Sequence, residues 1–191
     1  MPSWPTFSPL PMTEKLPLKG PRLELTAYSE DDLKALLPFF QDVSVLRYYL
    51  PTTVRPMNEP QLRQMLRDWN EGDWNHVFAL RFQGQLCGLV NLDGLDPHNS
   101  HAEIGIAITD RLLRGQGLAE EGLRLLLDFG FGELNLNRIW CRIISGNEPS
   151  VKLFQKAGFK PEGVLRRHVL RNGEFRDMLI FGLLRDEYQK S

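Results

Sequence analysis

The chain has 191 residues, of which 42% are hydrophobic and 25% are charged, and its 23 basic and 24 acidic side chains give a net charge of −1. A chain of this length and composition folds as one domain with a full hydrophobic core, which excludes a disordered chain, a coiled coil and a collagen-like repeat. The balanced charge excludes attachment to nucleic acid or to an anionic membrane through the overall field. No apolar run reaches the length of a membrane-spanning helix.

An extended or mobile arm is expected at 1–20, ahead of a single domain at 21–188. The arm is rich in proline and has no basic stretch before an apolar one, so it does not resemble a secretory signal peptide. The two cysteines, Cys87 and Cys141, lie in separate apolar runs and not in a C-x-x-C pair. This pattern predicts buried, reduced thiols, no metal site and a cytoplasmic location.

The first half of the domain is predicted to contain one strand and then short helices. Alternation of apolar and polar residues predicts the strand at 22–27. Ser29 then opens a helix, with Asp32 three residues later as its capping-box partner, and Pro38 should bend or end this helix. Two further helices are expected at 42–50 and from Asn58 to Gly72.

The second half alternates strands with helices. The turn residues Gln83-Gly84-Gln85 predict a hairpin, and a polar turn at 93–100 should separate that hairpin from the next strand. This order predicts a mixed α/β (α+β) domain with one mixed sheet flanked by helices. Strands are expected at 76–82, 86–92, 102–109, 138–145, 159–170 and 175–184, and helices at 117–131 and 147–157.

The segment Arg114-Gly-Gln-Gly-Leu-Ala119 lies between a predicted strand and a predicted helix. Its two glycines allow a tight turn and leave backbone N–H groups unshielded at a helix start, which is an anion site suited to a phosphate or a pyrophosphate. A Walker A loop is excluded because no lysine follows. A dinucleotide fingerprint is excluded because Glu120 stands where a third Gly or Ala is needed. A plain glycine-rich turn is the alternative.

Two motifs resemble those of a known family. Arg114-x-x-Gly117-x-Ala119 matches the Q/R-x-x-G-x-G/A signature of the GNAT N-acetyltransferases. The segment Asn147-x-x-Ser150 … Lys156-Ala-Gly158-Phe159 is similar to the corresponding segment of the RimJ/RimL branch, the ribosomal-protein N-terminal acetyltransferases, as are 21–25 and 172–177. The resemblance covers 21–188 and implies the GNAT-like acyl-CoA N-acyltransferase fold, with a mixed, mostly antiparallel sheet of about seven strands.

The resemblance implies that acetyl-CoA is the co-substrate, that no metal is needed, and that the acetyl group passes to an amine by direct attack in a ternary complex. The pyrophosphate would lie on the N–H groups of 116–119, and the pantetheine would pair with the main chain of 106–108 between splayed strands. The implied cofactor-binding residues are Ile106, Ala107, Ile108, Arg114, Gly115, Gln116, Gly117, Leu118, Ala119, Asn147, Ser150 and Phe154.

The same resemblance suggests two catalytic residues. Glu103 lies on the strand before the phosphate loop, where relatives place a carboxylate near the acceptor amine, and a salt-bridged strand glutamate is the alternative. Ser150 lies one turn into the helix after Asn147, where it could face the CoA sulfur. Many relatives carry a tyrosine general acid on this helix, but this chain has Phe154, so Ser150 or water must protonate the thiolate. The lone histidines, His76 and His168, are possible bases or structural residues.

The expected acceptor-binding residues are Tyr48, Tyr49, Trp74 and His168, with Trp69 as a further aromatic residue of the groove. A protein N-terminal α-amine is the favoured acceptor, because its pKa of about 7.7–8.0 is far below the value of about 10.4 for a lysine-type amine. The segment 24–73 carries more acidic than basic residues, which favours a cationic acceptor.

Other interpretations stay open. A small amine such as a polyamine or an aminoglycoside is the alternative acceptor. An acyl-CoA-binding module without turnover is a third hypothesis, because the tyrosine general acid is missing. No direct nucleic-acid or membrane partner is expected, and a homodimer is a further option.

Overall fold

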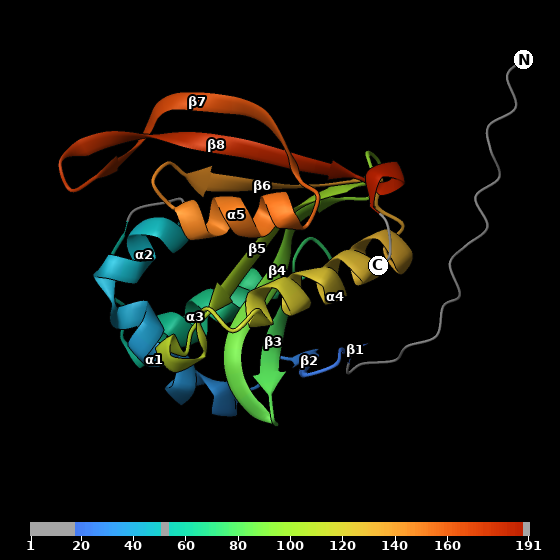
Figure 1. Ribbon diagram of the computed structural model, residues 1–191. Coiled ribbons are helices and arrows are strands. Elements are labelled where there is room, and N and C mark those ends of the chain that lie inside the picture. The colour runs from blue at the N-terminus through green and yellow to red at the C-terminus, as the bar shows by residue number, and fades with distance from the viewer. Residues whose placement is uncertain (1–17, 51–53, 189–191) are drawn as a thin grey trace, which may run out of the picture.

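The computed structural model describes residues 18–50 and 54–188, so most of the arm expected at 1–20 lies outside the described residues. The described residues form one eight-stranded sheet in the order β1-β2-β3-β4-β5-β6-β8-β7 (Figure 1). Neighbouring strands are antiparallel except for β5 and β6, which confirms the predicted mixed, mostly antiparallel sheet. The strands are β1 (Leu18–Lys19), β2 (Leu23–Ala27), β3 (His76–Phe82), β4 (Gln85–Asp96), β5 (His101–Ile108), β6 (Arg138–Ile144), β7 (Lys160–Arg171) and β8 (Glu174–Leu184).

Helices cover both faces of the sheet (Figure 1). On one face, α1 (Leu33–Gln41), α2 (Val43–Tyr49) and α3 (Glu59–Trp69) pack with Val77 and Leu89. On the other face, α4 (Leu118–Gly132) and α5 (Glu148–Lys156) pack with Phe78, Val90 and Ile104. Because successive strand side chains point to opposite faces, each strand contributes to both cores.

Local sequence signals explain where the helices begin. The backbone N–H of Ser29 donates to Asp32 at 2.9 Å, so the expected capping box is present, although the first turn is a 3-10 helix at Glu30–Asp32. A second capping box links Asn58 and Gln61 at the start of α3. The helix expected to bend or end at Pro38 continues to Gln41, and Phe39 and Phe40 after the proline are both buried.

Two boundaries differ from the sequence prediction. The sheet gains an eighth strand, because Leu18–Lys19 pairs with β2. The polar turn expected at 93–100 is shorter, because β4 continues to Asp96 and β5 begins at His101. Asp93 is therefore a strand residue paired with Glu103 of β5, and its side chain lies on the same face as that of Leu89. Among the described residues, no helix is long and apolar enough to cross a membrane.

The parallel strands β5 and β6 pair with each other only at their N-terminal ends. Its register joins His101–Glu103 to Arg138–Trp140 and then stops. Beyond Glu103, β5 continues to pair with β4, whereas beyond Trp140, β6 continues to pair with β8. The two strands therefore diverge, as the resemblance implied, and a slot opens in the middle of the sheet.

Candidate active site

A cleft lies where β5 and β6 diverge. The cleft is open to solvent at its mouth and encloses a volume of about 130 Å³. Its walls come from α2, α3, α5 and the strands β4, β5, β6 and β8. Eight of the residues expected at the site line it, namely Tyr48, Tyr49, Trp69, Glu103, Ile106, Asn147, Ser150 and Phe154.

The edge of β5 that faces the slot carries unpaired main-chain groups. Thr109 N–H donates to Cys87 of β4, and the Ala107 carbonyl also points towards β4. Since alternate residues of a strand direct their N–H and C=O groups to opposite sides, those of Ile106 and Ile108 point away from β4 beyond the last pair with β6, and the Ile108 carbonyl accepts from Arg114. An extended chain with amide groups can pair there like an added strand.

The phosphate loop follows this edge. Gly115 and Gly117 have φ values of +77° and +78°, in the left-handed region, and Gly117 is the N-cap of α4. The N–H groups of the first residues of α4 have no preceding helical turn to supply acceptors, so they are available to an anion. Arg114 Nε donates to the Ile108 carbonyl at 3.0 Å, which ties the loop to the end of β5.

Arg22 lies in the segment 21–25 that resembles the family, was not among the predicted site residues, and supports the same loop. Its Nη1 donates to the Gln116 carbonyl at 3.0 Å, and its Nε pairs with Glu121 at 2.9 Å. Glu121 also accepts the backbone N–H groups of Arg22 and Leu23. The start of β2 therefore holds the loop from outside the motif, and no local sequence pattern reveals that contact.

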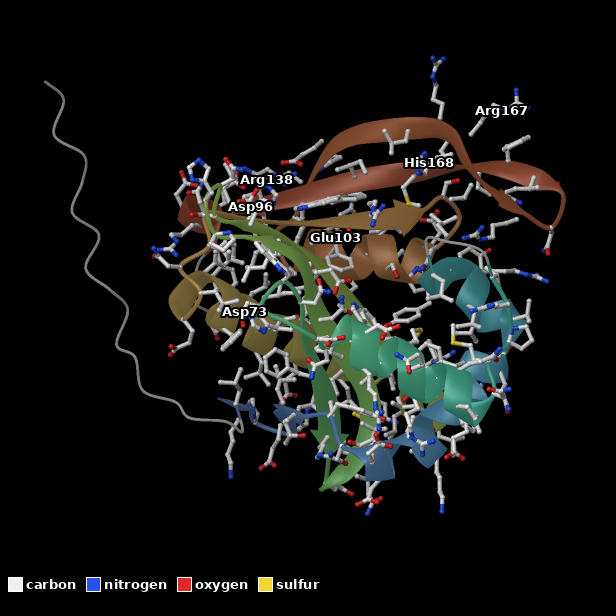
Figure 2. The ribbon with its side chains drawn as sticks, turned by 180° about the vertical axis from the view of Figure 1, so that it is seen from behind. Asp73, Asp96, Glu103, Arg138, Arg167 and His168 are labelled. Atoms are coloured by element: carbon white, nitrogen blue, oxygen red, sulfur yellow. The ribbon has the colours of Figure 1, made fainter. Side chains whose placement is uncertain are left out.

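Glu103 is engaged by a guanidinium. Its two carboxylate oxygens accept from Nε and Nη2 of Arg142 at 2.8 and 2.7 Å, a bidentate pair that links β5 to β6 just past the point of divergence. The bond to Glu103 raises the pKa of Arg142. Figure 2 shows Glu103 near the middle of the sheet. The role of Glu103 as the base stays a prediction. Both of its carboxylate oxygens accept from Arg142 in the structure.

Asp93 is a second carboxylate in the cleft, and the sequence analysis did not predict it. It accepts from Trp69 Nε1 at 2.5 Å and from Asn91 Nδ2 at 2.7 Å. Burial raises the pKa of the Asp93 carboxyl above its ordinary value, although these two hydrogen bonds act in the opposite direction. A carboxylate with a raised pKa inside a cleft is a candidate for proton transfer.

Helix α5 closes the cleft from the other face. Asn147 is its N-cap and accepts from the Ser150 N–H at 3.4 Å, so both residues lie at the helix start as expected. Phe154 is 5% exposed and packs edge to face on Phe159, with ring centroids 5.0 Å apart. The phenylalanine therefore belongs to both the hydrophobic core and the wall of the cleft.

Three aromatic or histidine candidates lie elsewhere. Trp74 is 62% exposed and does not line the cleft. His168 is exposed on β7, in the β7–β8 hairpin away from Glu103 (Figure 2). His76 contacts Phe129 edge to face, and burial lowers its pKa. Among the described residues, no group of three or more His, Cys, Asp or Glu side chains could hold a metal ion, and both cysteines are buried and free.

A family model described as "Acetyltransferase (GNAT) domain" matches residues 22–160, and the chain belongs to this family. It is therefore an N-acetyltransferase, and the divergent strands and the glycine loop belong to the matched region.

Similar proteins support the same class but carry different names. An "Uncharacterized N-acetyltransferase p20" of Bacillus licheniformis is 32% identical over 170 residues, covering 87% of this chain and 95% of that protein. A "Putative ribosomal N-acetyltransferase YdaF" of Bacillus subtilis is 34% identical over 128 residues, covering 65% and 69%. A "Spermidine N(1)-acetyltransferase" of Escherichia coli is 25% identical over 166 residues, covering 87% and 88%.

Solved structures share the fold. The spermidine N-acetyltransferase of Vibrio cholerae, in complex with CoA and spermine, superposes with a TM-score of 0.81 at 24% identity, covering 88% of this chain and 99% of that one. The RimL ribosomal L7/L12 α-N-protein acetyltransferase, in complex with coenzyme A, has a TM-score of 0.79 at 19% identity, covering 90% and 98%. At these identities the likeness establishes the fold alone.

Proposed function

We propose that the protein transfers the acetyl group of acetyl-CoA to the N-terminal α-amine of a protein, by direct attack in a ternary complex. Two sets of main-chain groups in the structure suit acetyl-CoA. The free edge of β5 offers N–H and C=O groups to the amides of the pantetheine arm, and the start of α4 offers N–H groups to the pyrophosphate.

The charged residues of the cleft favour a protein α-amine over a polyamine as the acceptor. Its charged lining residues are Asp93, Glu103 and Arg142, and the last two neutralise each other in a bidentate pair. One carboxylate without a cationic partner remains, which matches a single ammonium group. A polyamine carries several positive charges and would need further unpaired carboxylates along its length.

The acidic residues of 24–73 do not supply such carboxylates at the cleft. Glu30 pairs with Arg63 and Arg67, and Asp32 pairs with Arg81. Three more acidic residues of this segment form ion pairs, namely Glu24, Asp42 and Glu59. Five of the nine acidic residues of 24–73 are thus ion-paired within the protein, and none of the nine lines the cleft.

The chemical steps follow from these positions. The deprotonated amine nitrogen bonds to the thioester carbonyl carbon, the main-chain N–H groups on the free edge of β5 stabilise the developing oxyanion, and the C–S bond then breaks. The departing CoA thiolate takes a proton from Ser150 or water, since Phe154 has none to give. An α-amine suits this site because about a tenth of it is neutral at pH 7 and about half at pH 8, far more than for a lysine-type amine.

Thiol release from acetyl-CoA tests the proposal with three acceptors at equal concentration. They are a lysine-free, serine-initiated hexapeptide, the same peptide with a blocked N-terminus, and spermidine. We expect kcat/KM for the free peptide to exceed that for spermidine by at least about tenfold, with no turnover of the blocked peptide. Mass spectrometry should locate the acetyl group on the α-nitrogen.

The alternative is a small-amine acetyltransferase, favoured by the similarity to the Escherichia coli spermidine enzyme. Faster turnover of spermidine than of the peptide would support it and overturn the protein acceptor. A homodimer stays a prediction, which light scattering of the purified protein tests.

A further inference from the structure

We propose that Asp93, Asn91 and Tyr49 form the binding site for the acceptor ammonium group, and that Asp93 removes its proton before attack. The inference rests on the proposed acetyl transfer to an amine. It names the base and the group that recognises the acceptor, and both differ from the residues that the motifs indicated.

Two buried polar atoms in the cleft have no hydrogen-bond partner among the described residues. They are Oδ1 of Asn91 and the hydroxyl oxygen of Tyr49. Asn91 is 2% exposed, and both residues line the cleft. Buried polar atoms are almost always hydrogen-bonded, because an unpaired one costs free energy. Both atoms are therefore available to a ligand with N–H donors that enters the cleft.

The orientation of the Asn91 amide is fixed by its neighbour. A carboxylate accepts hydrogen bonds only, so the amide nitrogen must face Asp93 and the amide oxygen must face away from it. The amide lies over Gly105 of β5, where an added Cβ would be 2.7 Å from Oδ1. Gly105 thus leaves room for the unpaired oxygen beside the main chain of the slot.

Asp93 is held in place but is not neutralised. Its two oxygens accept from an indole N–H and an amide N–H, both uncharged donors, and each oxygen keeps a further lone pair. Glu103, directly opposite on β5, is instead occupied by Arg142. An ammonium group that enters the cleft therefore meets one available negative charge, at Asp93.

The groups that face Asp93 come from several elements. Glu103 of β5 and Arg142 of β6 act on its charge in opposite directions, and Trp69 of α3 donates to it. Burial, together with the charge of Asp93, raises the pKa of Tyr49 on α2, so this hydroxyl stays protonated at neutral pH. A neutral phenol can accept a hydrogen bond from an ammonium group through its oxygen.

A primary ammonium group has three N–H donors, and the site offers three acceptors. The proton balance is complete. One proton passes from the ammonium to the Asp93 carboxylate, the neutral nitrogen forms the bond to the acetyl carbon, and the C–S bond breaks. The nitrogen then loses a second proton to solvent or to the CoA thiolate, and the thiolate gains one proton in total. Asp93 then releases its proton to water.

The experiment compares Asp93→Asn with Asp96→Asn, a control on the same strand and outside the cleft. The probe is the serine-initiated hexapeptide with acetyl-CoA. We expect Asp93→Asn to lower kcat/KM for the peptide at pH 7 by about 10²-fold or more, with unchanged acetyl-CoA affinity by calorimetry. Asp96→Asn should stay within about twofold of the wild type.

The competing base is tested by removing its ion pair as a unit. The double variant Glu103→Gln/Arg142→Gln deletes both charges and leaves neither unpaired. We expect it to retain at least about a tenth of the wild-type kcat/KM. A double variant as inactive as Asp93→Asn, or an Asp93→Asn variant with full activity, overturns the assignment of Asp93.

Trp69→Phe provides a milder test if Asp93→Asn does not fold. Loss of the indole donor removes a bond that favours the charged carboxylate, so the pKa of Asp93 rises. The acidic limb of the kcat/KM profile should then move to higher pH, whereas a purely structural tryptophan would leave the limb in place. A wild type that acetylates no amine refutes the proposed function itself, whereas an active wild type with an unshifted limb refutes only the role of Asp93.

Discussion

The two halves of the site are built from different parts of the chain. The side expected to hold acetyl-CoA consists of main-chain groups, at the free edge of β5 and at the start of α4. The acceptor side consists of side chains, with Asp93, Asn91 and Tyr49 inside the cleft. A main-chain site is insensitive to most substitutions and depends on where glycine lets the backbone turn. A side-chain site depends on a few buried polar groups.

The largest expected effect is at the main-chain half. Gly117→Glu introduces a side chain and a negative charge at the N-cap of α4, at a φ of +78° that disfavours other residues. We expect acetyl-CoA affinity, measured by calorimetry, to fall by at least about 100-fold, about 2.7 kcal/mol. Binding with wild-type affinity would remove the phosphate loop from the cofactor site.

Gly84→Glu is the matched control for this substitution. Gly84 has a φ of +76° in the β3–β4 turn and open space around its missing side chain. It should therefore carry the same backbone strain without affecting acetyl-CoA. A similar loss of affinity in both variants would attribute the effect to the strain and not to the loop.

The acceptor half gives the next effect. Gly105→Ala places a methyl group against the Asn91 amide, which then has to move from Asp93. We expect kcat/KM for the peptide acceptor to fall by about tenfold while acetyl-CoA affinity is retained, a loss of about 1.4 kcal/mol. Gly163→Ala on β7, where the glycine has no neighbour within contact distance, should change neither quantity.

The contrast also explains how much the sequence could predict. The glycine loop, the cap at Asn147 and the capping box at Ser29 depend on residues close together in the chain, so their patterns are visible in the sequence. Glu103 was selected by its place before the loop. Its pairing with Arg142 depends on the register of two strands that are 39 positions apart at these residues.

Asp93 was missed for a related reason. The polar run after Leu92 was interpreted as a turn, whereas β4 continues through it to Asp96. Asn91 and Asp93 are two residues apart, so in a strand they share a face. That alternation within a buried strand was the available signal, but only the packing of α3 against the sheet places Trp69 on the carboxylate.

A smaller effect is expected at the support of the loop. Arg22→Ala removes the donor to the Gln116 carbonyl, while Glu121 keeps its two backbone bonds to the start of β2. Because Arg22 is about half exposed, we expect the KM for acetyl-CoA to rise by about fivefold to tenfold, with kcat for the peptide unchanged. Lys19→Ala, at an exposed ion pair with Glu24, is the control and should change neither constant.

The smallest effect is expected where the two halves meet, at the start of α5. Ser150 lines the cleft beside Asn147, and the helix N-terminus there favours a developing thiolate. If the hydroxyl only positions the pantetheine, Ser150→Ala costs one hydrogen bond of about 0.5–1.5 kcal/mol and raises the KM for acetyl-CoA by about twofold to tenfold. If it donates the proton, kcat falls while that KM stays constant, and Phe154→Tyr in the same chain should restore part of the rate by adding a phenol to the wall of the cleft. Steady-state kinetics of the single and double variants separate the two roles, because a positioning serine gains nothing from the tyrosine. We expect the positioning result, since the thiolate leaves into a cleft with an open mouth where water can supply the proton.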